Sequence, residues 1–66
     1  MRWGEVKRRL RRLGVEREDE RKRHELWRNP ANGRYALIPR HDQQEAPTGT
    51  LAAVLADLGI AREEFF

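Results

Sequence analysis

The chain contains no cysteine and no long apolar run, and each absence removes a class of protein. Without cysteine, the 66 residues cannot form a disulfide framework, a thiolate zinc site or a cysteine nucleophile. No apolar run reaches the roughly 18 residues that a membrane helix requires, and the opening MRWGEVKRRL lacks the apolar stretch of a signal peptide. We therefore expect a single cytoplasmic domain over residues 1–66, with one thin core and no membrane association.

Charge is abundant and unevenly distributed. Residues 1–41 hold 13 Lys and Arg against 6 Asp and Glu, a net of +7, whereas residues 42–66 hold 1 against 5, a net of −4. A basic surface of this kind attracts phosphate backbones without regard to base sequence. A solvated, highly charged surface with no ligand explains the same composition, so charge alone leaves both interpretations open.

Two segments have the spacing of amphipathic helices. Apolar residues at steps of three and four predict a helix over residues 3–13, ended by Gly14, and a second one over residues 51–58, ended by Gly59. The hydroxyls of Thr48 and Thr50 suit an N-cap for the second helix. The face of the first helix opposite its apolar stripe is expected to be basic, with Lys7, Arg8, Arg11 and Arg12.

Three short strands are expected between the helices. Residues 15–18 are the least distinct strand, followed by a charged turn at residues 19–21. Residues 24–28 and 34–39 form a hairpin around the turn sequence NPANG. Two helices packed on one face of a three-stranded antiparallel sheet make an α+β fold with the α-β-β-β-α order of a double-stranded-RNA-binding domain. Alternation does not decide which face of the hairpin is buried, because each face has one large apolar residue.

The chemistry most naturally assigned to this chain is proton transfer by histidine. His24 follows Arg21, Lys22 and Arg23 and precedes Arg28, so an imidazole and cations that bind phosphate lie close together in sequence. Such a group can take a proton from a ribose 2′-hydroxyl or give one to the departing 5′-oxygen. From these residues alone, the favoured interpretation is that His24 simply begins a strand.

Other candidates carry weaker signals. His41 is a second acid or base, a phosphate ligand or, as we favour, a structural residue of its loop. A metal site from the two histidines, Asp42 and Glu45 matches no known ligand spacing, so no metal or other cofactor is expected. Trp27 and Tyr35 are suited to stacking on unpaired bases if they are exposed, but core positions are the favoured interpretation for both.

Several separated segments together resemble the HicA toxins, small ribonucleases neutralised by a HicB antitoxin. The segment VKRRLRRLGV resembles the family's first helix, KRHELWR occupies the place of its Gly-x-His signature and following strand, and IPRH resembles its Val-Pro-x-His. The segments EAPTGTL and LADLGIAREEF resemble the approach to the last helix, that helix and its exit. The similarity covers nearly the whole chain.

The resemblance implies a messenger-RNA endonuclease, active without metal, with a HicB-like partner. The family's catalytic histidine falls on His24, and phosphate contacts are expected from basic residues around it and on the first helix: Lys22, Arg23, Arg28, Arg40, Arg8 and Arg12. One departure is Lys22, which stands where the family has glycine. The alternative function is an inactive RNA-binding or antitoxin-binding module of the same fold.

Overall fold

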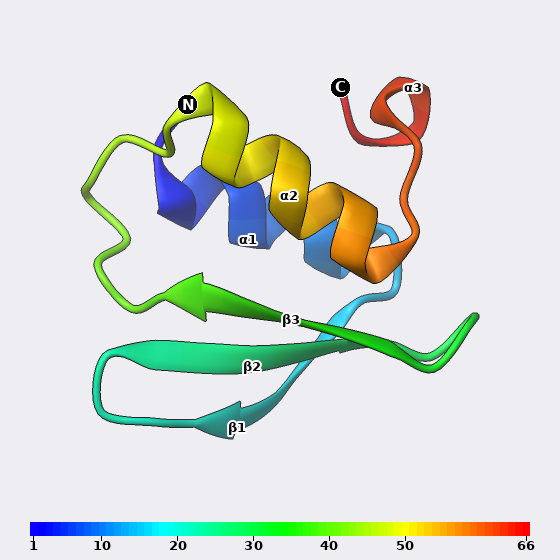
Figure 1. Ribbon diagram of the computed structural model, residues 1–66, viewed down its shortest axis with the longest axis horizontal. Coiled ribbons are helices and arrows are strands. Elements are labelled where there is room, and N and C mark those ends of the chain that lie inside the picture. Colours follow the sequence, from blue (N-terminus) through cyan, green and yellow to red (C-terminus); the bar gives the residue numbers. More distant parts are fainter.

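The computed structural model describes residues 1–66 and has six elements in two layers (Figure 1). In chain order they are α1 (Trp3–Arg12), β1 (Glu16–Glu20), β2 (His24–Asn29), β3 (Arg34–Pro39), α2 (Thr48–Leu58) and α3 (Arg62–Phe65). The strands form one antiparallel sheet in the order β1-β2-β3, and α1 and α2 cover the same face of it. The expected α+β architecture is confirmed, with a short third helix at the exit.

Helix α1 packs through an apolar stripe and ends in the expected glycine turn. Trp3, Val6 and Leu10 are buried, and Gly14 has a φ of 89°, a backbone conformation that residues with a Cβ rarely adopt. The expectation that Lys7 belongs to the exposed basic face is wrong, since its side chain is 3% exposed. Lys7 lies four residues after Trp3 and three before Leu10, so helical geometry places it at the margin of the buried stripe.

The first strand and its turn lie later than expected. Strand β1 spans Glu16–Glu20 rather than residues 15–18, and the turn falls at residues 21–23 rather than 19–21. The register against β2 shifts between Arg17 and Asp19, where a bulge inserts a residue into β1. Every residue of β1 is exposed, which is how an edge strand accepts a sequence made only of charged residues.

The hairpin of β2 and β3 directs its side chains alternately to the helices and to solvent. Glu25, Trp27 and Asn29 are buried under the helices, as are Ala36 and Ile38 of β3. The intervening side chains therefore lie on the other face of the sheet, which no element covers (Figure 1). This settles the orientation that alternation alone left open.

Helix α2 begins earlier than expected. Its N-cap is Pro47, and Thr48 is already helical, so the prediction of a threonine N-cap is wrong: no side-chain hydrogen bond caps this end. Proline has no backbone N–H to leave unpaired, and its fixed φ suits a helix entrance. The helix ends at Gly59, with a φ of 68°, as expected. Beyond it, Phe65 of α3 returns to the core while Phe66 stays exposed.

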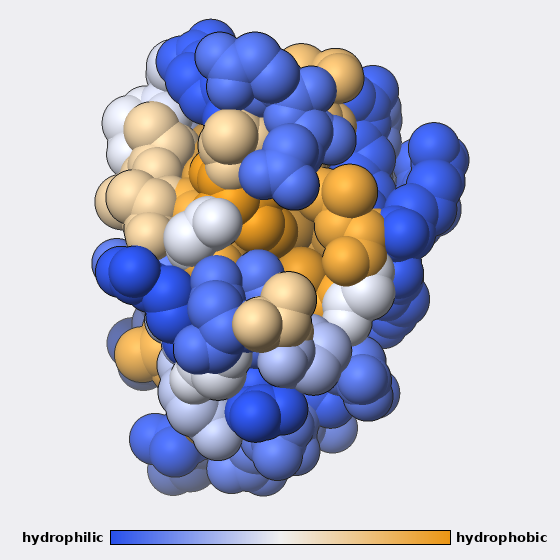
Figure 2. All heavy atoms as spheres, turned by 90° about the vertical axis from the view of Figure 1, so that its right-hand side faces the viewer, coloured by the Kyte–Doolittle hydropathy of each residue, from blue (hydrophilic) through white to orange (hydrophobic).

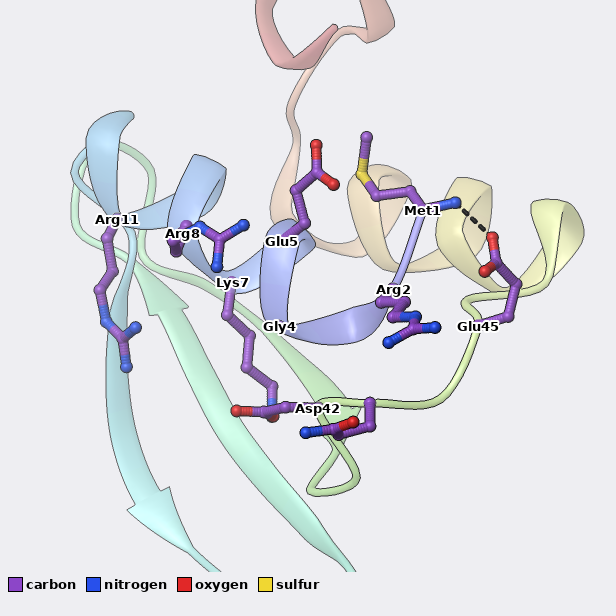
Figure 3. Close-up of a pocket in the computed structure, with 10 residues that line it drawn as sticks. Met1, Arg2, Gly4, Glu5, Lys7, Arg8, Arg11, Asp42 and Glu45 are labelled. Carbon is purple, nitrogen blue, oxygen red and sulfur yellow. Dashed lines mark hydrogen bonds and ion pairs between the residues drawn. The ribbon is translucent and has the colours of Figure 1, made fainter.

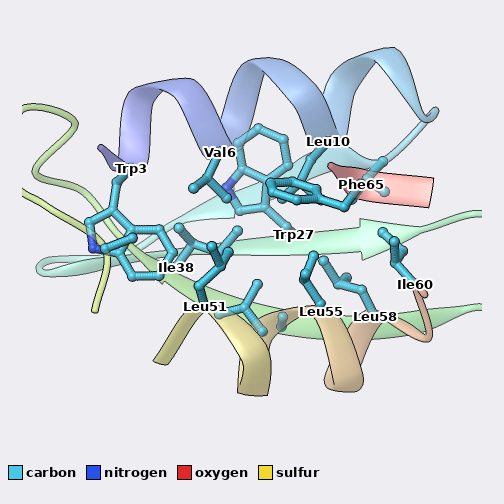
Figure 4. Packing of buried hydrophobic residues seen from close by; sticks show 14 residues of the cluster. Trp3, Val6, Leu10, Trp27, Ile38, Leu51, Leu55, Leu58, Ile60 and Phe65 are labelled. Carbon is cyan, nitrogen blue, oxygen red and sulfur yellow. The ribbon is translucent and has the colours of Figure 1, made fainter. Parts of the chain in front are cut away.

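One apolar cluster holds the two layers together (Figure 4). Its 14 residues come from both long helices, the hairpin, the exit segment and the loops before β1 and α2, with Trp3 and Trp27 as the largest fully buried side chains. At the end of the molecule with the hairpin tip, apolar atoms are visible between hydrophilic rims (Figure 2). The two layers are therefore joined by a thin core that is open to view at this end. None of the helices is both long and apolar enough to cross a bilayer.

Candidate functional site

Backbone hydrogen bonds bring the β1–β2 turn and the end of β3 together at one end of the sheet. The Arg21 amide donates to the His24 carbonyl at 2.8 Å, closing the turn, and the Arg40 amide donates to the Arg23 carbonyl at 3.2 Å. His24 lies directly opposite Pro39 in the β2–β3 ladder. The sheet therefore fixes the backbone of His24 between the basic turn and Arg40.

The His24 side chain is exposed and belongs to the uncovered face of the sheet. Its neighbour Glu25 points the other way, into the layer between sheet and helices. No hydrogen bond or ion pair engages the His24 ring, so both nitrogens are open to a ligand. Imidazole is chemically able to act as a proton acceptor or a proton donor.

The cations beside His24 differ in how they are engaged. Lys22 and Arg23 are exposed and form no ion pair. Arg40 is held: its guanidinium donates to the carbonyls of Arg21 and Lys22 at 3.4 and 3.3 Å and lies 3.5 Å from a Glu20 carboxylate oxygen. Arg40 therefore ties the end of β3 to the turn that carries the two free cations.

Lys22 replaces the family glycine without backbone strain. No residue other than glycine has a positive φ anywhere in the chain. The turn at residues 21–23 is therefore built in conformations that ordinary L-residues adopt, and Lys22 adds an exposed ammonium.

Arg28 shares the face of His24 but lies at the far end of β2. Arg28 is four positions after His24, which corresponds to about 13 Å along a strand. Arg28 is half-buried and forms no ion pair or hydrogen bond through its guanidinium. It lies directly opposite Tyr35 in the ladder.

Arg8 and Arg12 are not brought together with His24. Both are exposed on the side of α1 that faces away from the sheet. Arg8 lines a cleft of about 560 Å³ between α1 and the loop before α2, together with Arg2, Arg11 and Glu45 (Figure 3). The expected phosphate-binding residues thus divide between two surfaces, one on the sheet and one on the helix.

The same cleft contains an ionic network that the sequence pattern did not predict, in which Lys7 and Glu25 are buried and Asp42 is 59% exposed. The Lys7 ammonium is 3.1 Å from a Glu25 carboxylate oxygen and 2.5 Å from one of Asp42, and the Trp27 indole donates to Glu25 at 3.0 Å. Burial raises the pKa of Glu25, but these hydrogen bonds and the charges of Lys7 and Arg17 outweigh it, so its pKa lies below the usual carboxyl value. Two sequence features could have predicted this network: Lys7 lies beside the apolar stripe of its helix, and Glu25 shares a strand face with Trp27.

The other residues singled out in the sequence lie in different environments. Trp27 is fully buried, as favoured, but the core assignment of Tyr35 is wrong: its side chain is 47% exposed on the uncovered face, because the helices cover the other one. His41 is exposed, and its carbonyl rather than its ring bonds within the loop, accepting from the Gln44 amide. Nowhere do three His, Asp or Glu side chains gather in a way that could hold a metal ion.

The comparisons with known proteins agree with this architecture. Residues 3–60 match the family model described as the HicA toxin of bacterial toxin-antitoxin systems. A chain in the crystal structure of the E. coli HicAB toxin–antitoxin complex superposes with a TM-score of 0.78 at 29% identity, over 89% of this chain and 98% of that one. No curated protein matches the sequence. Since the family model spans most of the sequence and the fold agrees, this chain belongs to the HicA toxin family.

Proposed function

We propose that this toxin is an endoribonuclease that cleaves messenger RNA with His24 as its catalytic residue and without a metal ion. The observation that carries the proposal is the position of the His24 imidazole: exposed, unengaged and at the end of the sheet where the Lys22–Arg23 turn is held. A phosphodiester bound by these cations would lie beside an imidazole, a group able to take or give a proton. Its messenger-RNA substrate would place the toxin in the cytoplasm.

The proposed reaction is an internal transesterification. The ribose 2′-oxygen loses its proton and bonds to the adjacent phosphorus, while the bond from phosphorus to the 5′-oxygen breaks and that oxygen gains a proton. The products are a 2′,3′-cyclic phosphate and a 5′-hydroxyl. His24 serves as the base or the acid of this exchange, water serves as the other proton acceptor or donor, and Lys22 and Arg23 stabilise the charge that builds on the phosphate oxygens.

The proposed partner is a HicB-like antitoxin. The solved complex that this chain resembles is a HicAB toxin–antitoxin complex. A partner that covers the exposed turn at residues 21–23 would exclude RNA from His24, and acidic groups on it would meet Lys22 and Arg23. Contact with this turn is therefore the proposed mode of neutralisation.

A second candidate function is an inactive RNA-binding or antitoxin-binding module. The specific observation in its favour is that no second titratable side chain forms a hydrogen bond or ion pair with His24. Under this proposal the chain binds its partners and cleaves nothing.

Incubation of defined single-stranded RNA with the purified chain in EDTA separates the two candidates. Under the nuclease proposal the wild type generates cyclic-phosphate ends, His24→Ala does not, and His41→Ala, which changes the other exposed histidine, retains most activity. Binding without cleavage by the wild type would favour the inactive module. Equal cleavage by wild type and His24→Ala would contradict the assignment of His24.

A further inference from the structure

The uncovered face of the hairpin carries three cross-strand pairs in a row, starting at His24. The pairs are His24 with Pro39, Leu26 with Leu37, and Arg28 with Tyr35. Tyr35 and Leu37 are 47% and 51% exposed, although large apolar side chains are usually buried when the fold offers a place for them. The face therefore has an apolar middle between an imidazole at one end and an arginine at the other.

The charges around this row favour one path for a bound polyanion over another. On the β1 side, Glu16 lies opposite Arg28 and Asp19 opposite Leu26. Asp19 pairs with Arg21 at 3.6 Å, whereas Glu16 forms no ion pair, so the Glu16 carboxylate repels a polyanion on this side. Within the row, Arg28 is the only cation, and no carboxylate engages it. A phosphate chain that passes His24 is therefore favoured along the β2–β3 hairpin and disfavoured across β1.

The Tyr35 ring indicates the kind of nucleic acid that fits. An exposed aromatic side chain on a sheet binds an unpaired base by stacking, whereas a duplex hides its base faces. The roughly 13 Å between the His24 and Arg28 positions corresponds to a few nucleotides of a single strand. The apolar side chains of Leu26 and Leu37 between them lie where a sugar or base edge would pass.

We propose that single-stranded RNA binds along the uncovered face of β2 and β3, with an unpaired base on Tyr35, a phosphate on Arg28 and the reacting phosphate at His24. The inference rests on the proposed nuclease function, because His24 fixes where the strand must pass. It assigns Tyr35 and Leu37 as binding residues a few nucleotides from the cleavage point. It also leaves Arg8 and Arg12, on the far side of α1, outside the path of the substrate.

The first test is binding of a single-stranded oligonucleotide made uncleavable by 2′-O-methyl groups, followed by fluorescence anisotropy. Tyr35→Ala should weaken binding roughly 5- to 150-fold, the loss of one stacked base, while Tyr35→Phe should keep it. Leu37→Ala should weaken binding less than Tyr35→Ala. The control is Phe66→Ala, which removes a 58% exposed ring at the C-terminal end and should leave binding unchanged. Circular dichroism verifies the fold of each variant.

The second test compares two arginines by salt dependence. Arg28→Gln should lower the slope of log affinity against log salt by about 0.7, the contribution of one phosphate contact on a single strand, and Arg12→Gln should leave it unchanged. The reverse result would place RNA on the helix surface and overturn the proposal. RNA binding that is unchanged in Tyr35→Ala would also overturn the proposal. If that variant keeps RNA binding and loses antitoxin binding, the face belongs to the antitoxin.

The outcomes separate this inference from the nuclease proposal. If the wild type cleaves RNA through His24 while Tyr35→Ala binds the oligonucleotide normally, the nuclease stands and this path is wrong. If the wild type cleaves nothing but Tyr35→Ala loses single-strand binding, the path stands as a binding site and the nuclease is wrong. A duplex of the same sequence should bind more weakly and respond to neither Tyr35 variant; a duplex that binds as tightly would contradict the inference.

Discussion

The Lys7 ammonium and the Glu25 carboxylate form an ion pair at 3.1 Å between α1 and β2, with both residues buried. Asp42, in the loop after β3, contacts the same ammonium at 2.5 Å. One lysine therefore connects the helix layer, the central strand and the loop that leads from Arg40 to α2. The central strand, β2, begins at His24. The network therefore holds the strand of the proposed catalytic residue against the helices.

Removing the Lys7 charge should strongly destabilise the protein. Lys7→Met keeps an apolar chain of similar length but leaves the buried Glu25 carboxylate with only the partly exposed Arg17 guanidinium, 3.4 Å away, as its cation. Breaking a buried pair typically costs up to about 3–5 kcal/mol. A domain of this size has roughly 3–10 kcal/mol of stability in total. Urea denaturation measures the loss, with exposed Lys22→Met as the control, expected within about 0.5 kcal/mol of wild type. Equal stability of the two variants would mean that the buried pair contributes nothing.

Stability should fall in acid because the pKa of Glu25 is lowered in the folded state. A carboxyl group whose pKa is depressed by folding stabilises the fold above its unfolded pKa, near 4.3, and loses this contribution as pH falls through the lower, folded value. Glu25→Gln should therefore flatten the decline of unfolding free energy between about pH 5 and pH 2. Parallel pH profiles for wild type and variant would contradict the depressed pKa.

Gly59 should not tolerate a side chain. At its φ of 68°, a Cβ would lie 2.6 Å from the Asn32 amide nitrogen, which donates to the Leu58 carbonyl at 2.9 Å. Backbone strain and the displaced hydrogen bond should together cost Gly59→Ala about 2 kcal/mol. Gly49→Ala is the matched control: that position is helical with open space around it, so thermal unfolding should show equal or slightly higher stability.

Arg40 should act through the turn that precedes His24. Its guanidinium and amide contact the carbonyls of residues 21–23, so Arg40→Gln should loosen this turn and speed hydrogen exchange of the Arg21 amide. Displacement of His24 should lower cleavage roughly 10- to 100-fold.

The control for Arg40 is Arg34→Gln, which removes the guanidinium that bonds the Asp57 carbonyl at the other end of β3. It should leave both readouts near wild type. A reduced salt dependence of RNA binding in Arg40→Gln, with unchanged exchange, would make Arg40 a phosphate ligand instead.

The sequence predicted the elements that have a clear apolar period and missed those that depend on tertiary partners. Both long helices and the hairpin follow from spacing and glycine or turn residues. Strand β1 has no apolar alternation at all; its pairing and its bulge come from β2. Thr48 looked like a cap because hydroxyls favour that place, but Pro47 already fixes the helix entrance.

The candidate site divides in the same way. Neighbours in sequence, such as Lys22, Arg23 and His24, remain neighbours in space because a tight turn holds them. Distant predictions depended on the sheet face: helix packing decides that Tyr35 is exposed and Trp27 buried, and no local pattern contains that choice. Lys7 was predicted on the exposed face because lysine is charged, although its helical position beside the apolar stripe favoured burial.

Chemical rescue shows whether the His24 imidazole moves the proton in RNA cleavage. His24→Ala should cleave a defined single-stranded RNA roughly a hundred- to ten-thousandfold more slowly than wild type, and free imidazole should restore part of that rate. If His24 is the base, the restored rate should rise with pH together with the unprotonated fraction of the added imidazole. If His24 is the acid, the restored rate should fall as pH rises, because the protonated fraction falls. If His24→Ala cleaves RNA at the wild-type rate without added imidazole, His24 is not the catalytic residue.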